Sequence, residues 1–174
     1  MNISISPIKI REHYAVMDQL MRELHVSEKS FFAQTASWDG ISENYLRHVI
    51  SMQEECDGVC LMAYVDGLPA GFIFGYLEEA DDSRIEAYTG DTLYVSDGYV
   101  QETYRRQGIY RRLNEELEKI FIAKGVRRIV RYTLTNNHRM QQLLDTLQYK
   151  PVRLVYEKWL NEDGTQALDL GMPS

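Results

Sequence analysis

The most chemically distinctive stretch of the chain is a basic turn between a predicted strand and a predicted helix. It reads Tyr104-Arg-Arg-Gln-Gly-Ile-Tyr110, follows a strand expected at residues 92–100, and leads directly into an amphipathic helix. The N-terminus of a helix presents about four unpaired backbone N–H groups and a partial positive charge. Gly108 lets the backbone approach an anion without a Cβ atom in the way, and the neighbouring arginines add formal charge. The turn therefore predicts a phosphate or pyrophosphate site.

Two other phosphate-binding motifs are excluded at this turn. It lacks the Gly-Lys-Ser/Thr of a Walker A loop and the three spaced glycines of the dinucleotide-binding fingerprint. One glycine flanked by arginines is also typical of a basic surface helix that holds no ligand. From the residues alone, both interpretations stay open.

The charge of the chain is distributed unevenly. Residues 105–131 hold nine of the 19 basic and three of the 26 acidic residues, a net of +6, which leaves 10 basic and 23 acidic residues, a net of −13, elsewhere. Nucleic-acid binding needs a broad positive face, because phosphates are neutralised along a whole backbone. The pattern fits a compact anion held at one place, with an acidic surround that attracts a cationic partner. Nucleic acid is therefore not expected as a partner.

The length of 174 residues and the 44% hydrophobic content are typical of one globular domain, here residues 1–174 with a core over about 3–160. No apolar run approaches the roughly 20 residues of a membrane span, so no membrane partner is expected. The start of the chain has no secretion signal. The two cysteines, Cys56 and Cys60, are too few for a disulfide framework or a zinc cage, so no metal site is predicted. These features predict a cytoplasmic protein.

Hydrophobic periodicity predicts the element order β-α-α-β-β-β-α-β-α-β, which is a mixed α/β sheet in one domain. The strands, with Asp66-Gly67 as a hairpin turn, are expected at residues 3–8, 59–65, 70–77, 92–100, 126–134 and 152–160. Apolar residues at helical spacing predict helices over residues 14–24, 45–50, 109–121 and 136–147, with Lys124-Gly125 as a C-terminal cap signal of the third. The remaining segments read as a loop at 27–40, a polar connection at 78–91 and a loosely held tail at 161–174.

The basic turn and its surroundings resemble motif A of the GNAT N-acetyltransferases. The pattern Val100-x-x-x-Tyr104-Arg105-x-x-Gly108-Ile109-x-Arg111 is similar to the family's Gln/Arg-x-x-Gly-x-Gly/Ala core after a strand. Residues 59–77 resemble the family's second and third strands, and residues 133–149 resemble its Asn-x-x-Ala…Gly-Phe segment. The resemblance implies a single-domain GNAT-like fold, with a mixed, mostly antiparallel sheet, a splayed pair of fourth and fifth strands, and flanking helices.

The same resemblance implies where acetyl-CoA binds as the acyl-donor co-substrate. The pantetheine arm and the thioester carbonyl would lie along the exposed backbone of Gly98, Tyr99 and Val100, where the fourth strand bulges away from the fifth. Asn137 matches an asparagine that touches the pantetheine, and the residues alone also allow a helix N-cap there. The pyrophosphate would be held beside Arg105 by the backbone N–H groups of Arg106, Gln107, Gly108, Ile109, Tyr110 and Arg111.

Several positions depart from the family pattern. Tyr110 stands where the family has Gly or Ala, and Leu144 stands where many members have a tyrosine as general acid. Positions at which other members carry a glutamate or histidine base hold Tyr132, Tyr94 and Ser96. Proton transfer would therefore fall to these three candidate catalytic residues or to ordered water. A neutral amine positioned against a polarised thioester needs little more than that positioning.

The resemblance implies an N-acetyltransferase that acts in a ternary complex on a primary amine of a small molecule, peptide or protein. The acidic run Glu78-Glu79-Ala80-Asp81-Asp82, with Glu86 nearby, is compatible with a cationic acceptor and equally with a solvated loop. The alternative is a non-catalytic acyl-CoA-binding or protein-interaction module on the same fold, because fold does not fix function. A monomer or a homodimer is expected.

Overall fold

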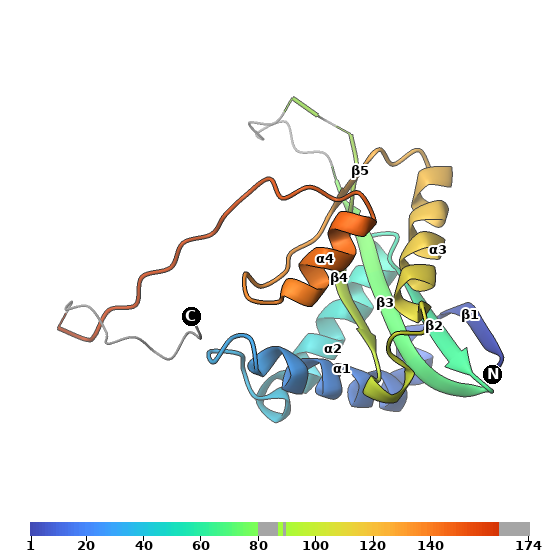
Figure 1. Cartoon of the computed structure of the whole chain (residues 1–174), viewed down its shortest axis with the longest axis horizontal. Coiled ribbons are helices and arrows are strands. Elements are labelled where there is room, and N and C mark those ends of the chain that lie inside the picture. The colour runs from blue at the N-terminus through green and yellow to red at the C-terminus, as the bar shows by residue number, and fades with distance from the viewer. Residues whose placement is uncertain (80–86, 89, 164–174) are drawn as a thin grey trace. The chain divides into compact units, whose positions relative to one another are not determined.

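Five strands form one mixed sheet in the computed structural model, which describes residues 1–79, 87–88 and 90–163 (Figure 1). The strands lie side by side in the order in which they occur along the chain. Every neighbouring pair is antiparallel except β4 and β5, which are parallel. The predicted α/β class with a mixed, mostly antiparallel sheet is confirmed. The strands are β1 Ile3–Ile8, β2 Val59–Val65, β3 Leu68–Glu78, β4 Thr92–Val100 and β5 Arg128–Val130.

Contacts divide the chain into two units. The larger unit comprises Met1–Val26 and Ala36–Tyr132 and contains the whole sheet. The smaller unit comprises Ser27–Thr35 and the described residues from Thr133 onward. None of the described helices is long and apolar enough to cross a membrane. The α-helices are α1 Tyr14–Lys29, α2 Trp38–Glu55, α3 Ile109–Ala123 and α4 His138–Thr146.

The sheet has a hydrophobic core on each face, because the side chains of a strand alternate between its two faces. On β3, Phe72 and Phe74 belong to the core shared with α1 and α2, whereas Ile73 between them belongs to the core shared with α3. The predicted apolar stripe of α3 is confirmed, since its side chains are buried in the second core. Its buried members are Ile109, Leu113, Leu117 and Phe121.

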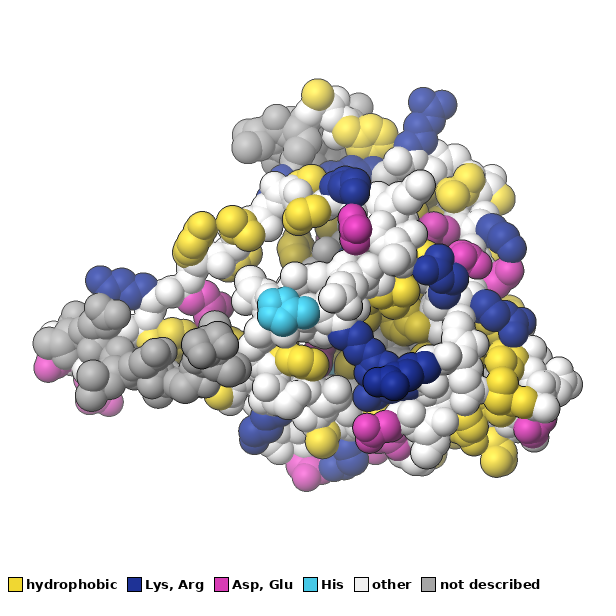
Figure 2. Space-filling model, viewed as in Figure 1, with side chains coloured by type: hydrophobic (Ala, Val, Ile, Leu, Met, Phe, Trp, Pro, Cys, Tyr) yellow, Lys and Arg dark blue, Asp and Glu magenta, His cyan; other side chains and the backbone are white. Residues whose placement is uncertain are grey.

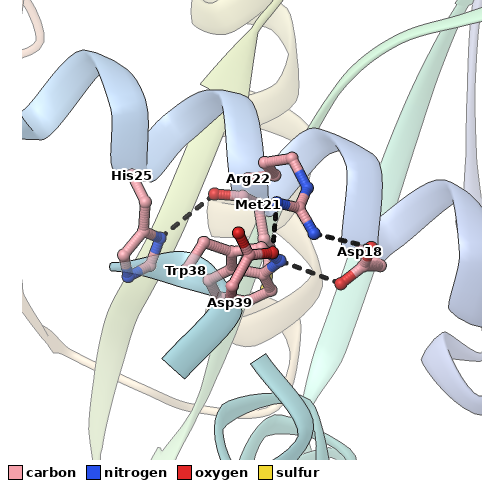
Figure 3. Close-up of polar contacts among 6 residues, drawn as sticks. All are labelled: Asp18, Met21, Arg22, His25, Trp38 and Asp39. Carbon is pink, nitrogen blue, oxygen red and sulfur yellow. Dashed lines mark hydrogen bonds and ion pairs between the residues drawn. The ribbon is translucent and has the colours of Figure 1, made fainter. Parts of the chain in front are cut away.

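Polar contacts hold α1 against α2 (Figure 3). Trp38, the first residue of α2, donates its indole N–H to Asp18 Oδ1 on α1 at 2.8 Å. The His25 Nδ1 lies 3.1 Å from the Met21 carbonyl, and because a carbonyl only accepts, this nitrogen carries a proton. The His25 ring is also 4.7 Å from the Trp38 ring. These contacts fix the partly buried imidazole between α1 and α2.

A β-bulge interrupts β4 at Ser96. Phe74 of β3 is opposite Asp97, but the next residue, Gly75, is opposite Val95. Ser96 is therefore one residue in excess on β4, as in a β-bulge.

The bulge changes which face of the sheet the second half of β4 presents. Val95 belongs to the core beside α3, whereas Tyr99 belongs to the core beside α1 and α2. In a regular strand these two residues would lie on one face, because they are four positions apart. Asp97, opposite Phe74, is thus turned toward α1 and α2.

Two predicted strands differ from the structure. The strand predicted at 126–134 is only Arg128–Val130, and the strand predicted at 152–160 is not formed, with a single bridge residue at Leu160. A strand is stabilised by pairing with a neighbour, and none of the described strands pairs with 152–159. Val152 is accordingly 81% exposed. The predicted connection at 78–91 and the predicted tail at 161–174 lie largely outside the described residues.

Replacing Thr92 by valine is expected to stabilise the protein. Thr92 is the first residue of β4, is fully buried, and its Oγ1 has no hydrogen-bond partner among the described residues. A buried hydroxyl without a partner costs about 1–3 kcal/mol, and valine has nearly the same shape and suits a strand. The free energy of unfolding, measured by urea titration, should rise by about 1 kcal/mol. A fall would mean that the hydroxyl has an acceptor.

Candidate active site

The turn before α3 is open on the side that an anion would occupy. Gly108 has a φ of +74°, which favours glycine, and a Cβ atom placed on it would meet no heavy atom within 4 Å. The Arg112 N–H donates to the Gly108 carbonyl at 3.1 Å, so the N–H groups before Arg112 have no acceptor within the helix. Lys and Arg side chains gather over this turn in Figure 2. The turn has the geometry of an anion-binding helix N-terminus.

The arginines before α3 play different structural parts. Arg105 donates from Nε to the Val100 carbonyl at 2.9 Å, and its guanidinium carbon lies 5.3 Å from the centre of the Tyr99 ring. It therefore ties the turn to the end of β4. Arg106 is exposed and has a φ of +64°, a left-handed conformation that costs energy in a residue other than glycine.

The other predicted pyrophosphate residues are placed by the first turn of α3. Gln107 and Arg111 are exposed, and Arg111 Nη1 lies 4.0 Å from Glu115 Oε1. Ile109 is only 1% exposed and packs in the core beside α3. Its side chain cannot reach a ligand, so only its backbone N–H could contribute to binding.

β4 has an open edge beyond the point where β5 ends. The parallel pairing covers only Thr92–Tyr94 opposite Arg128–Val130. Within the described sheet, β4 from Val95 onward therefore has β3 as its only strand neighbour. The pairing ends where the family resemblance implies that the two strands diverge. The unpaired edge runs through Gly98 to the basic turn, and its backbone can hydrogen-bond an extended ligand.

Tyr110 covers Gly98 on the face beside α3. A Cβ atom on residue 98 would lie 2.7 Å from the Tyr110 hydroxyl, so the glycine makes room for the phenol. Arg131, directly after β5, donates from Nη2 to the Tyr110 hydroxyl and from Nη1 to Asn114 Oδ1 at 2.9 Å. Asn114 is buried on α3 and donates to Glu118 Oε1 at 2.5 Å. These hydrogen bonds join α3 to the end of β5 beside the open edge.

Arg131 and Asn114 were not predicted as site residues from the sequence. Asn114 follows Leu113 of the apolar stripe, and a polar residue so close to a buried stripe is the signal that points to a specific partner. Tyr110, which replaces the small residue of the family pattern, thus accepts a hydrogen bond from Arg131 and packs over Gly98.

Three tyrosines form a row across β3, β4 and the end of β5. The ring centres of Tyr76 and Tyr94 are 5.4 Å apart, and those of Tyr94 and Tyr132 are 5.6 Å apart, both in edge-to-face contact. Tyr132 is 68% exposed. The structure thus brings together two of the three predicted catalytic residues.

The row affects the acidity of its phenols. Burial raises the pKa of Tyr94 to about 12, and the neighbouring Tyr76 and Asp97 add to the shift. Burial also raises the pKa of Tyr76. Both phenols therefore stay protonated at neutral pH and can donate a hydrogen bond but not accept a proton.

Asp97 is a buried carboxylate that the sequence analysis did not single out. It is 7% exposed; its Oδ1 accepts from the Tyr45 hydroxyl at 2.7 Å and its Oδ2 accepts from Ser96 Oγ at 2.7 Å. Burial raises the pKa of Asp97, whereas the two hydrogen bonds and the nearby His25 and His48 act to lower it. Asp97 is the one charged residue of β4, and that was the available signal. The third predicted catalytic residue, Ser96, thus donates a hydrogen bond to a titratable carboxylate, that of Asp97.

Asn137 and Leu144 belong to the smaller unit. Asn137 is the N-cap of α4, where its Oδ1 accepts from the Met140 N–H at 3.1 Å, so the predicted capping role is confirmed. Leu144 is 9% exposed. Among the described residues of the whole chain, no cluster of three or more His, Cys, Asp or Glu side chains could hold a metal ion.

Residues 17–148 match the model of the acetyltransferase (GNAT) family. The chain belongs to this family. The match includes the open turn, all of β4, α3 and β5, and the resemblance carried by Arg105 and Gly108 is therefore confirmed. No curated protein matches this GNAT chain.

Solved structures agree with the GNAT fold at low sequence identity. A mutant of the BH1408 protein from Bacillus halodurans has a TM-score of 0.73 at 18% identity, over 91% of this chain and 99% of that chain. AAC(6')-Iy in complex with a CoA bisubstrate analogue has a TM-score of 0.66 at 14% identity, over 91% and 99%. An aminoglycoside acetyltransferase from an uncultured soil metagenomic sample, HMB0005, has a TM-score of 0.65 at 18% identity, over 92% and 100%.

Acetyl-CoA as the co-substrate of the GNAT chain is consistent with these neighbours. AAC(6')-Iy has been crystallised both with the bisubstrate analogue and with CoA. The open turn at Gly108 also fits a pyrophosphate, because its backbone is accessible and lies at a helix N-terminus.

Proposed function

We propose that this GNAT protein is an N-acetyltransferase that transfers the acetyl group of acetyl-CoA to a primary amine by direct attack in a ternary complex. The observation that carries the proposal is the continuity of three features: the open turn at Gly108, the unpaired edge of β4, and the tyrosine row at Tyr94 and Tyr132. An anion site, an open strand edge and a set of proton donors follow one another along one strand. All of them lie in the larger unit.

Each part of acetyl-CoA has a counterpart along this path. The pyrophosphate would accept hydrogen bonds from backbone N–H groups between Arg106 and Arg111. The amides of the pantetheine arm would pair with the backbone of Gly98 to Val100 as a strand does. Tyr110, which lies beside Gly98, would then line the arm from the α3 side, with Arg131 hydrogen-bonded to its hydroxyl. The pantetheine contact of Asn137 remains part of this proposal.

The chemistry rests mainly on position. A neutral amine held against the thioester carbonyl attacks it, the C–S bond breaks, and the proton lost by nitrogen goes to the leaving thiolate. Tyr94 and Tyr132 would donate hydrogen bonds to the carbonyl oxygen or to the departing sulfur. A pKa of about 12 at Tyr94 suits that role, because the phenol stays protonated.

The acceptor class is supported by the fold neighbours and by the charge of the chain. Two neighbours are aminoglycoside acetyltransferases, whose acceptors carry amines. The chain is acidic outside residues 105–131, which favours a cationic amine. Most of the acidic run from Glu78 to Glu86 lies outside the described residues, so it adds no structural support.

Acetyl-CoA is expected to raise the melting temperature of the protein, whereas free acetate is not. Ligand at about 100 times its dissociation constant adds about 2.7 kcal/mol to the stability of the folded state. For a chain of this length that corresponds to a shift of roughly 5–10 °C in differential scanning fluorimetry. Acetate at the same concentration is the control, because it lacks the pyrophosphate and the pantetheine. No shift at millimolar acetyl-CoA would argue against a cofactor site.

The alternative is a module that binds acyl-CoA without turnover. Measuring thiol release with a panel of primary amines distinguishes this module from a transferase. Release of free CoA thiol with any of them supports the transferase. Binding of acetyl-CoA with no thiol release across alkyl, aromatic and aminoglycoside amines would support the non-catalytic module instead.

A further inference from the structure

We propose that Ser96 and Asp97 form a proton relay that removes a proton from the ammonium group of the acceptor. The inference rests on the proposed acetyl transfer and assigns to it the proton acceptor that the family positions lack. Those positions hold Tyr94, Tyr132 and Ser96, and burial raises the pKa of Tyr94 to about 12, so its phenol keeps its proton at neutral pH. Asp97 is a buried carboxylate that is hydrogen-bonded to one of the three, Ser96.

The bulge in β4 is what brings the relay together. Ser96 is the excess residue of the bulge. Its side chain is partly buried, and it lies on the strand whose edge is unpaired beyond Tyr94. Its hydroxyl donates to Asp97 Oδ2 at 2.7 Å. The other carboxylate oxygen is held by Tyr45 of α2, also at 2.7 Å, which fixes the orientation of Asp97. Ser96 therefore links a strand with an open edge to a buried carboxylate by a hydrogen bond.

The relay gives a function to the buried carboxylate of Asp97, whose burial by itself lowers the stability of the fold. Taking a carboxylate out of water without a cationic partner in direct contact is unfavourable, and Asp97 forms no ion pair within the described residues. Its two neutral donors leave lone pairs that can take up a proton. The titratable groups that influence it or respond to it are His25 of α1, Tyr45 and His48 of α2, Cys60 of β2, Tyr76 of β3 and Tyr94 of β4.

The proton balance of the step is simple. The acceptor ammonium gives a proton to Ser96 Oγ while the Ser96 hydroxyl proton passes to Asp97 Oδ2, so the amine becomes neutral and Asp97 becomes a carboxylic acid. The amine attacks the thioester carbonyl, an N–C bond forms, the C–S bond breaks, and the second nitrogen proton leaves with the thiol. Asp97 then returns its proton to solvent through Ser96.

The test compares two acceptors that differ in charge. One is the primary alkylamine with the highest turnover in the panel, which is protonated at pH 7. The other is its alkoxyamine analogue, in which the carbon next to nitrogen is replaced by oxygen, so that it has nearly the same shape and is neutral at pH 7. For Asp97→Asn, kcat/KM is expected to fall about 10²–10⁴-fold with the alkylamine and by less than about threefold with the alkoxyamine.

Four further variants sharpen the result. Ser96→Ala should reproduce the selective loss, and Ser96→Thr, which keeps the hydroxyl, should restore most of the activity. Tyr45→Phe removes a hydrogen bond that lowers the pKa of Asp97, so the rise of kcat/KM with pH should move to higher pH. Thr92→Val, which deletes a buried hydroxyl on the same strand, is the matched control and should leave both acceptors unaffected.

The outcomes separate the relay from a structural role and from the proposed function. Equal losses for both acceptors in Asp97→Asn would overturn the relay and leave Asp97 as a structural residue. Selective loss with the alkylamine supports it. If no amine releases thiol from acetyl-CoA with the wild-type protein, the proposed acetyl transfer itself fails and the relay fails with it.

Discussion

Gly108→Val is expected to lower the affinity for acetyl-CoA roughly 100-fold or more, a loss of about 2.7 kcal/mol in binding free energy. The open space in front of Gly108, where a Cβ atom meets nothing within 4 Å, is the space that the pyrophosphate would fill. A branched side chain there would keep the phosphates away from the N–H groups at the start of α3. Isothermal titration with acetyl-CoA measures the loss.

The variant also carries a cost in stability that must be separated from the loss in binding. At a φ of +74°, a residue with a Cβ atom is strained by about 1–2 kcal/mol. Gly125, just past the other end of α3, provides the matched control, because it has a φ of +92° and equally open surroundings. Gly125→Val should lower the melting temperature to a similar degree while leaving the affinity for acetyl-CoA intact. Equal affinities in the two variants would mean that the phosphate site lies elsewhere.

Tyr132→Phe is expected to lower turnover about 10²-fold at saturating acetyl-CoA, the usual cost of removing one hydrogen-bond donor from a developing charge. Tyr132 is the more exposed of the two candidate tyrosines and is the second residue after β5. Tyr94→Phe should have a smaller effect, because Tyr94 is partly buried between Tyr76 and Tyr132. The measurement is the rate of thiol release with a good amine acceptor.

The control for these variants is a phenol of the same sheet that lies away from the open edge. Tyr64 of β2 packs against the core beside α1 and α2, and Tyr64→Phe should retain full turnover. If Tyr94→Phe and Tyr132→Phe both retain it as well, the tyrosines take no part in the reaction. Positioning of the amine would then account for the acceleration without them.

Local signals allowed much of the fold to be predicted from the sequence. The bounds of β1, β2 and β4 are those expected from their alternating apolar residues. The hairpin between β2 and β3 turns at Asp66 and Gly67, whose φ values of +49° and +85° are those of the tight turn that this residue pair favours. The open backbone at Gly108 was predicted in the same way, because it depends only on the residues of the basic turn itself.

What could not be predicted depends on pairing between distant segments. The bulge at Ser96 exists because Gly75 of β3 pairs with Val95 while Phe74 pairs with Asp97, and neither strand alone specifies that register. The bulge turns the Asp97 side chain toward α1 and α2, so its burial could not be predicted from the sequence of β4 alone. The strand expected at 152–160 is not formed, although its apolar residues alternate as in a strand. None of the described strands pairs with this segment.

The two outer strands of the sheet bear on how the protein behaves at high concentration. An exposed strand edge is a template on which another chain can add, and aggregation often starts there. β5 offers only three residues, Arg128–Val130, too short a template for a stable intermolecular ladder. β1, at the other side, contains Pro7, which has no N–H to donate. The same shortness of β5 that opens β4 to a ligand also means that β5 itself offers too few residues to pair with another molecule of its kind.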